Sequence, residues 1–522
     1  MERKWWTLIA VSVAIFMLLL DITVVNVALP DIQRSLHSSF ADLQWVVNAY
    51  SLTLAAFLLT AGALADLLGR KRVFTVGLVV FTAASATCGL SGSPLALNIA
   101  RAVQGTGGAM MFATSLALIA SAFHGKERGV AFGVFGGVIG AAVAVGPVVG
   151  GVITSGIGWE WIFFVNVPIG VGAVALTLSQ VSESRDPDAS GVDWIGLVTF
   201  SGSLFLFVLA LIEGNEKGWG STRIVAFLAA AAVLLVLFIV AEARQRRPML
   251  DLTLFRRPAF AGASAVAFAI SSSMFAMFLY LTLYIQDVLG YDPLQAGLRF
   301  LPITLLSFAV APLSGRLSVR IPVRLLLGVG MLLVSGGLLT MTAIHVSSGW
   351  TALIPGFLLA GAGIGMINPP LASTAIGVVH HSRSGMASGI NNTFRQVGIA
   401  TGIAGLGAVF QHQVTHKTVA ALDSTAAGRG VVASSHGKLS GALVSGEVSQ
   451  LTSRLAPASR AALGHAYRVG FTEAFTTILT IGTGIALAGA LLAFALVRSS
   501  DFVSSQAPSA EGAEQEPAVA AA

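Results

Sequence analysis

Almost the whole of this chain is a succession of apolar segments, each long enough to cross a lipid bilayer. A transmembrane helix needs about 20 predominantly apolar residues. Charged residues make up only 10% of the 522 residues, whereas soluble proteins carry about 25%. The chain is therefore expected to be an all-α integral membrane protein with 14 transmembrane helices. The predicted spans lie near residues 7–29, 44–65, 73–91, 96–120, 129–152, 161–181, 192–213, 222–242, 259–284, 296–314, 323–344, 350–377, 386–411 and 470–497.

Lysine and arginine residues are distributed unevenly between the loops, and this predicts the orientation of the chain. Cytoplasmic loops of membrane proteins carry an excess of these residues. With the N-terminus inside, the short outer loops contain only Arg34, Lys217 and Arg223, while the inner segments contain clusters such as Arg70–Arg72. Both termini are therefore predicted to be cytoplasmic, in a multi-pass protein of the plasma membrane. The net charge of +6 is explained by this topology and does not indicate a nucleic-acid partner.

Three segments lie outside the predicted spans. Residues 412–468 are rich in Ser, Gly and Ala and are predicted to form a long polar outer loop. Residues 499–522 are acidic and rich in Ala, Ser, Glu and Pro, a composition typical of a disordered tail. Residues 243–258 are predicted to form a basic cytoplasmic linker.

The turn between the second and third spans combines an acid, two glycines and three consecutive bases, which is unusual in so apolar a chain. The residues are Gly62, Asp66, Gly69, Arg70, Lys71 and Arg72. The pattern resembles the signature loop between helices 2 and 3 of the major facilitator superfamily of transporters. In that family the loop is understood as a cytoplasmic latch, so the resemblance implies a gating role for these residues. An ordinary basic turn on the inner face is the alternative.

The resemblance implies a major facilitator fold with two six-helix bundles and an inserted central helix pair. The N-terminal bundle would comprise residues 1–190, the inserted pair with its linker residues 191–258, and the C-terminal bundle residues 259–498. A weaker copy of the first turn, Gly315–Arg324, follows the tenth span. It would take the matching place in the second bundle. Transporters built from such parallel halves bind substrate between them near the midplane.

The first span contains two polar residues, Asp21 and Asn26. A carboxylate inside a membrane helix is costly and marks a functional site by default. Asp21 is expected ~12 Å below the outer surface, at 1.5 Å of rise per residue. The run Leu20–Pro30 resembles a motif of the fourteen-span drug/proton antiporters, the EmrB/QacA type. That resemblance implies a role for the acid in proton or substrate handling; a structural hydrogen-bonding role is the alternative.

The fourth span carries Arg101 and Gln104 in a run that resembles the proton-transfer motif of the superfamily. Arg101 is expected ~8 Å below the outer surface, close to the depth of Asp21. Because helices 1 and 4 both line the central cavity in this fold, a coupled Asp21–Arg101 pair is a reasonable hypothesis. Protonation of Asp21 would then release the arginine. The alternative is that Arg101 snorkels to the outer interface.

The fifth span ends in a Gly-Pro-x-x-Gly-Gly pattern made by Gly146, Pro147, Gly150 and Gly151. It resembles the motif that marks exporters within the superfamily, although Ala142 stands where a leading glycine is usual. Proline bends a helix, and glycines let a neighbouring helix approach closely. General small-residue packing is the alternative explanation.

Four polar residues lie about halfway along the thirteenth span: Asn391, Asn392, Arg395 and Gln396. Polar groups at this depth are expected to face a water-filled cavity or a substrate, and the family has a similar stretch. Arg299, at the outer end of the tenth span, is a weaker candidate, for which snorkelling to the interface is favoured.

Other chemistries are not indicated. No Gly-x-x-x-x-Gly-Lys-Ser/Thr loop is present, so ATP is not expected to drive transport. The adjacent His380 and His381 have no partner ligands nearby in the sequence, so no metal site is predicted. The single cysteine, Cys88, excludes an internal disulfide. No nucleophile–base pair is evident, so the chain is not expected to be an enzyme and no cofactor is implied.

The sequence and its resemblance together favour an exporter of lipophilic small molecules, such as antibiotics, driven by the proton gradient through alternating access. Its partners would be the substrate, protons and the lipid bilayer. A proton-coupled uptake symporter and an exporter of a specific host metabolite remain open alternatives. A receptor or scaffold without transport is the least favoured, because it gains little from costly intramembrane charges.

Overall fold

The computed structural model describes residues 2–123, 125–185, 191–245, 248, 250–318, 320–377, 384–434 and 457–498, and regular structure within these ranges is entirely helical. The first helices are α1 (Arg3–Leu36), α2 (Phe40–Leu68), α3 (Arg70–Gly89), α4 (Pro94–Ala122), α5 (Gly125–Ile157), α6 (Trp161–Phe164) and α7 (Asn166–Gln180). Next come α8 (Trp194–Lys217), α9 (Thr222–Arg244) and a 3-10 helix, η1 (Leu252–Arg256).

The rest of the chain begins with one long helix that contains two π-helical turns. It consists of α10 (Pro258–Ile270), η2 (Ser271–Phe275), α11 (Ala276–Leu283) and η3 (Tyr284–Val288). The helices that follow are α12 (Pro293–Arg299), α13 (Leu301–Leu317), α14 (Val323–Met341), the 3-10 helix η4 (Trp350–Leu353), α15 (Ile354–Gly377), α16 (Ser384–Asp423), α17 (Ala426–Ser434) and α20 (Pro457–Leu496).

Helices occupy all fourteen segments that the sequence predicts as spans. The sixth is divided between α6 and α7, and the tenth between α12 and α13. Among the described residues, twelve helices are long and apolar enough to cross a membrane, and a bent pair within α5 raises the number to thirteen. The remaining predicted span, α16, is a 40-residue helix interrupted by polar residues. The count of fourteen therefore stays a prediction.

Helix α5 contains a bend of 40° between Val134–Ala142 and Ala144–Ile157. Pro147 lies inside this helix. Proline has no N–H to donate to the carbonyl four residues earlier, and its ring clashes with that carbonyl. The bend lies at residue 143, four residues before the proline, as this mechanism requires.

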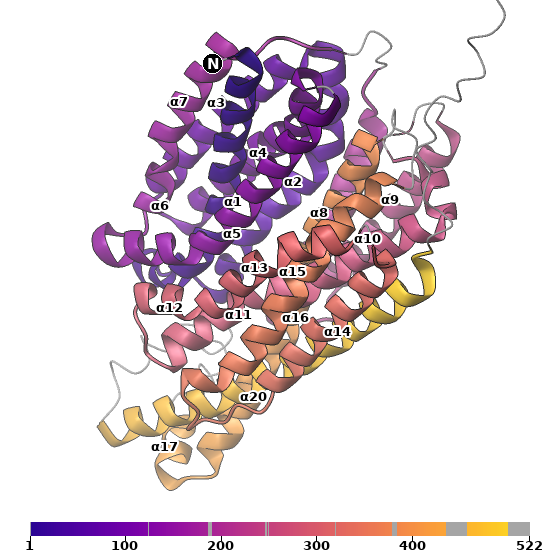
Figure 1. Cartoon of the computed structure of the whole chain (residues 1–522). Coiled ribbons are helices and arrows are strands. Elements are labelled where there is room, and N and C mark those ends of the chain that lie inside the picture. Colours follow the sequence, from indigo (N-terminus) through magenta and orange to yellow (C-terminus); the bar gives the residue numbers. More distant parts are fainter. Residues whose placement is uncertain are drawn as a thin grey trace, which may run out of the picture.

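The helices form two groups in space (Figure 1). Helices α1–α7 make the N-terminal group, in which α4 packs against α2 and α3, and α1 packs against α5. Helices α10–α20 make the C-terminal group, in which α14 packs against α15 and α20, and α16 packs against α20. The expected pair of helical bundles is thus present.

The two groups share one hydrophobic core near one end and a second, smaller one along α2 and α16. Leu20, Val24 and Ala28, in the second half of α1, belong to a cluster that also contains residues of α10, α11, α16 and α20. The first half of α1, including Leu8 and Ile15, belongs to a second cluster made entirely of N-terminal-group residues. The groups therefore pack tightly near the predicted outer end. Toward the predicted inner end the core around α1 stays within its own group, while α2 still contacts α16, where Leu59 packs beside Gly389.

Backbone contacts reinforce the closure at the predicted outer end. Gln286 donates a hydrogen bond to the carbonyl of Val27 on α1, at 2.7 Å. The backbone N–H of Leu294 on α12 donates to Ser155 Oγ on α5, at 3.0 Å. A Cβ atom on Gly151 would lie only 2.6 Å from the carbonyl oxygen of Pro293. The glycine at this position lets α5 and α12 touch backbone to backbone.

Helices α8 and α9 pack against each other beside both groups. Helix α8 contacts α2 of the N-terminal group and α16 of the C-terminal group. Helix α9 exposes a row of large apolar side chains, as expected for a surface that faces lipid: Val225, Val233, Leu235, Val236, Leu237, Ile239 and Val240. This placement is compatible with an inserted pair.

The prediction of a polar loop over residues 412–468 is wrong for the part that the structure describes. Helix α16 continues to Asp423, α17 follows, and α20 begins at Pro457. At 1.5 Å per residue, the 40 residues of α16 and of α20 each extend about 60 Å, roughly twice the hydrocarbon thickness. Leu422, Val431 and Leu463 form a small core that holds these extensions together. Residues 435–456 and 499–522 lie outside the described residues.

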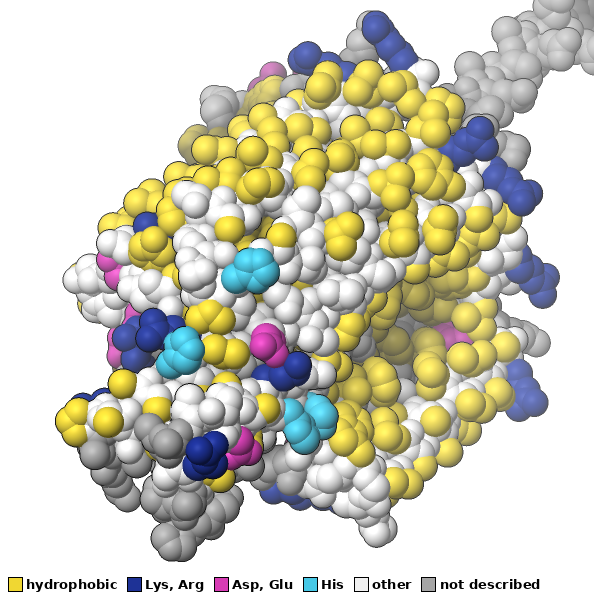
Figure 2. Space-filling view, turned by 90° about the horizontal axis from the view of Figure 1, so that it is seen from below, with side chains coloured by type: hydrophobic (Ala, Val, Ile, Leu, Met, Phe, Trp, Pro, Cys, Tyr) yellow, Lys and Arg dark blue, Asp and Glu magenta, His cyan; other side chains and the backbone are white. Residues whose placement is uncertain are grey.

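The surface has the distribution of side chains that a bilayer requires. Figure 2 shows a broad hydrophobic face bordered by Lys and Arg side chains on its right edge, with His and mixed charges gathered on the left. An apolar band between polar margins matches the hydrocarbon core between two headgroup layers.

We expect Gly151→Ala to weaken the closure of the predicted outer end. The new methyl group would collide with the backbone at Pro293 and Leu294, which cannot rotate away as a side chain could. Distances between spin labels on the outer ends of α5 and α12 should therefore increase. Gly156→Ala is the matched control, because nothing lies within 4 Å of its Cβ position. Unchanged distances in Gly151→Ala would contradict the importance of this contact.

Candidate functional site

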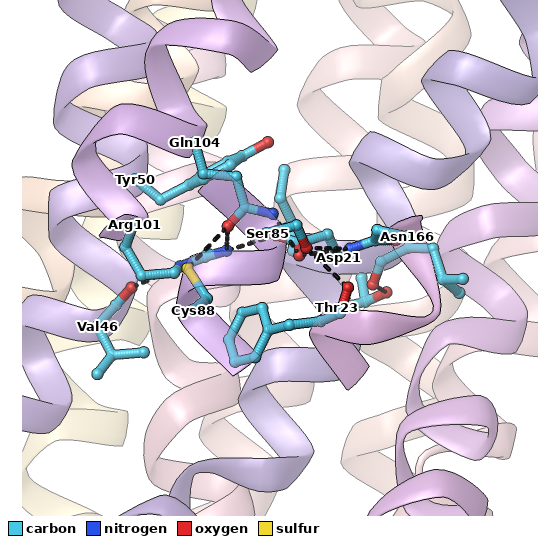
Figure 3. A network of polar contacts seen from close by, with 12 residues as sticks. Asp21, Thr23, Val46, Tyr50, Ser85, Cys88, Arg101, Gln104 and Asn166 are labelled. Carbon is cyan, nitrogen blue, oxygen red and sulfur yellow. Dashed lines mark hydrogen bonds and ion pairs between the residues drawn. The ribbon is translucent and has the colours of Figure 1, made fainter. Parts of the chain in front are cut away.

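The carboxylate of Asp21 on α1 accepts contacts from three side chains on other helices (Figure 3). Arg101 Nη1 lies 2.5 Å from Asp21 Oδ2. Gln104 Nε2 donates to Asp21 Oδ1 at 2.9 Å, and Asn166 Nδ2 donates to the same oxygen at 3.1 Å. Arg101 and Gln104 come from α4, and Asn166 is the first residue of α7. Three helices thus meet at one carboxylate.

Arg101 is held on every side. Its Nη1 also donates to Gln104 Oε1 at 2.7 Å, and its Nε donates to the carbonyl of Val46 on α2 at 3.1 Å. The guanidinium lies over the ring of Tyr50, with its carbon 4.3 Å from the ring centroid, and 5.7 Å from that of Phe163. A cation over an aromatic face is stabilised by the ring quadrupole. The arginine is therefore fixed inside the bundle and does not snorkel.

The ion pair is fully buried, with side-chain exposures of 2% for Arg101 and 0% for Asp21. Taking two charges out of water is costly, and their attraction repays this only with good geometry and further hydrogen bonds. Gln104 and Asn166 supply those bonds to Asp21, and Val46 supplies one to Arg101. Removing one partner of such a pair typically costs about 3–5 kcal/mol.

Sequence reasoning missed three members of this site: Asn166, Ser85 and Tyr50. Besides Asp21, Asn166 Nδ2 donates to Ser85 Oγ on α3 at 3.0 Å, and Ser85 Oγ donates to the carbonyl of Phe163 at 2.9 Å. A buried amide within an apolar stretch was the available signal for Asn166, but its partner is 145 positions away. We call these three together with Asp21, Arg101 and Gln104 the Asp21 network.

Asn26 does not join the Asp21 network. Its Nδ2 donates to the carbonyl of Ile22 on its own helix at 3.2 Å. The amide thus bonds one turn back along α1. The structure therefore gives no support to the predicted role of Asn26 at the same point as Asp21.

The four polar residues of α16 lie in the C-terminal group and form a separate cluster. Asn391 is buried and donates to the carbonyl of Ala263 at 3.4 Å. Arg395 Nη1 donates to Asn368 Oδ1 on α15 at 3.3 Å, and the guanidinium carbon lies 5.5 Å from the ring centroid of Phe275. Asn392 and Gln396 are partly buried beside them. The predicted site residues thus fall into two clusters, one in each half.

The predicted gating turn is bonded to its own half. Asp66 pairs with Arg70 at 2.9 Å. Glu183, beyond the end of α7, accepts from the backbone N–H groups of Lys71 at 2.9 Å and Arg72 at 3.2 Å. These groups are the unsatisfied donors of the α3 N-terminus. The turn therefore ties α3 to the segment after α7.

The two glycines of this turn differ in their surroundings. Gly69 has φ = 111° and separates α2 from α3, a conformation that glycine adopts without strain. Gly62 lies in the interior of α2, and nothing comes within 4 Å of its Cβ position. In this conformation Gly62 therefore neither ends a helix nor allows a close approach of another helix.

The glycine–proline motif of α5 is a packing surface with two sides. Gly146 faces Thr23 on α1, and a Cβ on Gly150 would lie 3.0 Å from Val24 Cα on the same helix. Gly151 faces α12, and Pro147 touches Gly297 there. The motif thus links α1 to the opposite half, through the helix that it bends.

Arg299, the remaining arginine candidate, stacks on two aromatic rings. Arg299 lies with its guanidinium carbon 3.4 Å from the ring centroid of Tyr291 and 5.2 Å from that of Trp350, and it donates to the carbonyl of Gln295. It is an aromatic-stacked side chain at the predicted outer interface. Within the described part of the chain no three His, Cys, Asp or Glu side chains converge as metal ligands. His380 and His381 lie outside the described residues.

We expect Arg101→Met to destabilise the protein by about 3–5 kcal/mol, because Asp21 then stays buried without its cation. The double variant Asp21→Asn with Arg101→Met should recover part of this loss, since no uncompensated charge remains. Thermal unfolding of the detergent-purified proteins, followed by loss of the monodisperse peak, gives the ranking. Equal stability of Arg101→Met and the wild type would contradict the importance of the buried pair.

Comparison with known proteins places this geometry in a family. Residues 11–403 match the model of the Major Facilitator Superfamily. The chain is 39% identical over 404 residues to the multidrug resistance protein Stp of Mycobacterium tuberculosis, covering 77% of this chain and 75% of that protein. It is 35% identical over 413 residues to the tetracenomycin C resistance and export protein of Streptomyces glaucescens, covering 79% and 77%.

Solved structures agree on the fold. An inward-facing, occupied bacterial homolog of the human lysosomal transporter Spinster superposes with a TM-score of 0.63 at 17% identity, covering 96% of this chain and 98% of that one. The family consists of membrane transporters, so the prediction of a carrier rather than an enzyme is confirmed. With its two helical bundles, its buried Asp21–Arg101 pair and a family match across most of its length, the chain belongs to the major facilitator superfamily of membrane transporters.

Proposed function

We propose that this protein is a proton-driven exporter of lipophilic small molecules, antibiotics among them, in the plasma membrane. The observation that carries the proposal is the buried Asp21–Arg101 ion pair. A carboxylate paired with a cation inside the membrane is costly, and intramembrane ionisable residues typically mark proton relays or substrate pathways. The names of the relatives, which include multidrug resistance and antibiotic export proteins, support a drug-like substrate.

In the proposed cycle, protonation of Asp21 neutralises the carboxylate and removes its attraction for Arg101. Gln104 and Asn166 can still hydrogen-bond to the neutral acid. The free-energy cost of protonation therefore falls on Arg101, which stays buried without its counter-charge. A change in helix packing that lowers this free-energy cost would link protonation of Asp21 to the movement of the halves. A conformational change requires such a difference in interaction free energy between its two states.

The contacts between the halves give this movement a direction. In the present conformation α5 and α12 close the predicted outer end. Substrate would enter from the inner end, beside the contact that α2 and α16 keep there. The short-loop charge asymmetry orients both termini toward the cytoplasm. Export then requires the outer contacts of α5 with α12 to open while the cytoplasmic turn at residues 62–72 gains contacts across the halves. A proton-coupled uptake symporter would use the same parts with the opposite coupling.

We expect Asp21→Asn to abolish coupling between drug and proton movement, because the amide cannot exchange a proton. In inside-out vesicles with an acidic interior, adding a lipophilic drug should raise the internal pH of wild-type vesicles and leave Asp21→Asn vesicles unchanged. A pH-sensitive dye reports the change.

The matched control is Asp31→Asn, which removes the same charge from the same helix. Asp31 is half-buried and pairs with Arg34 near the predicted outer end of α1. This variant should behave like the wild type. Drug-dependent proton release by Asp21→Asn would refute the assignment of Asp21, and proton influx together with drug uptake would favour the symporter.

A further inference from the structure

We propose that Arg395 binds the negatively charged group of the substrate, and that the preferred cargo is an aromatic monoanion, a carboxylate or a phenolate. The proposal rests on the transport function proposed above and specifies its substrate class. It rests on a difference between the two polar clusters: the buried charges cancel in the N-terminal cluster and do not cancel in the C-terminal one.

In the N-terminal half the buried charges cancel. Asp21 and Arg101 form one pair, and the Asp21 network contains no other charged side chain. A cationic substrate finds no free carboxylate there unless it displaces Arg101. Attraction for a cation at this point is therefore weak.

In the C-terminal half the charge is not balanced. Arg395 is partly buried, and among the described residues its contacts are with the neutral side chains of Asn368 and Phe275. Asp287 is the acid of the adjoining long helix, but it is exposed at the predicted outer end, where its electrostatic neighbours are Arg34 and Asp31. It lies twelve positions beyond Phe275, or ~18 Å along the helix axis. Within the part of the chain that the structure describes, Arg395 thus has no counter-charge and lies between apolar helices.

Unpartnered polar atoms occur on α16, which carries Arg395, and on η2, which carries Phe275. Among the described residues, Gln396 Oε1, Thr393 Oγ1 and Ser271 Oγ are buried and make no hydrogen bond. Ser271 and Phe275 begin and end the same π-helical turn, η2, and α16 approaches that turn closely at Gly398. Buried polar groups are normally satisfied, and π-helical turns occur frequently at functional sites. A bound ligand that offers hydroxyl or N–H groups would satisfy these atoms.

The chemistry of the cluster selects the ligand. Guanidinium presents a planar fork of donors that matches a carboxylate and stays charged at all physiological pH values. Phe275 and its apolar surroundings favour an aromatic body next to the anion. Gln396 and Ser271 add hydrogen bonds to ring substituents. Dications, by contrast, would meet a positive charge with no free acid to offset it.

The test is a binding measurement with three anthracene probes that differ only in charge: anthracene-9-carboxylate, anthracene-9-methanol and anthracene-9-methylammonium. The wild-type protein in lipid nanodiscs, without any proton gradient, should bind the carboxylate about tenfold tighter than the alcohol, because hydrogen bonds to charged groups are the stronger ones. The ammonium probe should bind weakest. Probe fluorescence anisotropy gives the affinities.

Variants test which arginine causes the tighter binding of the carboxylate probe. Arg395→Gln should remove the advantage of the carboxylate over the alcohol, while Arg395→Lys retains part of it. Arg299→Gln is the control, because it removes the same charge from the aromatic stack at the predicted outer interface. If Arg395→Gln does not fold, Asn368→Ala leaves the charge in place, removes the side chain that orients it, and should reduce the carboxylate preference severalfold.

Each outcome bears on the proposal. Equal binding of the three probes by the wild type, or preference for the ammonium probe, would overturn it. A carboxylate preference that survives Arg395→Gln but is lost in Arg299→Gln would move the site to the outer interface and overturn the assignment. Because binding needs no proton gradient, a carboxylate preference without drug-dependent proton movement would refute the antiport mechanism alone.

Discussion

The buried pair of Asp21 and Arg101 is the interaction on which the N-terminal half is organised. The polar atoms that satisfy it come from α1, α2, α4 and α7, with α3 contributing Ser85 one bond further away. Two apolar side chains at positions 21 and 101 would hold these helices together at a lower free-energy cost, because replacing buried ion pairs by hydrophobic residues is often stabilising. A charge that is removed and restored by a proton gives a physical reason to keep this arrangement.

Helix α1 connects this charge to the contact between the halves. Thr23 and Val24 lie within one turn of Asp21 and pack on Gly146 and Gly150 of α5. One turn further, the Val27 carbonyl accepts from Gln286 of the opposite half. Any shift of α1 that follows a change in the charge of Asp21 therefore acts directly on the closed outer end. Gly150 and Gly151 make this connection stiff, because backbone atoms of the neighbouring helices lie against them and no side chain can absorb the movement.

The sequence was sufficient to predict the helical segments and the Asp21–Arg101 neighbourhood, because each depends on local hydrophobicity or on depth along a helix. It was insufficient for Asn166 and Ser85, whose place in the site depends on how α3 and α7 pack. The sequence also could not tell that Asn26, a polar residue in the same span as Asp21, hydrogen-bonds to its own helix instead of joining the Asp21 network. The helical extension beyond residue 412 was missed because a Ser/Gly/Ala-rich composition conceals the few apolar residues, Leu422, Val431 and Leu463, that form its core.

In the proposed mechanism the two polar clusters have separate roles, one in each half. The N-terminal cluster is electrically neutral and fully enclosed, which suits a proton site that must not bind substrate. The C-terminal cluster carries one uncompensated cation and unpartnered polar atoms, which suits a substrate site that must not bind protons, because arginine does not titrate in the physiological range. Substrate and proton then need not compete for one carboxylate. In this proposal their exchange is coupled through the packing of α1, α5 and α12, so that each ligand acts on the other only by its preference for one arrangement of the halves.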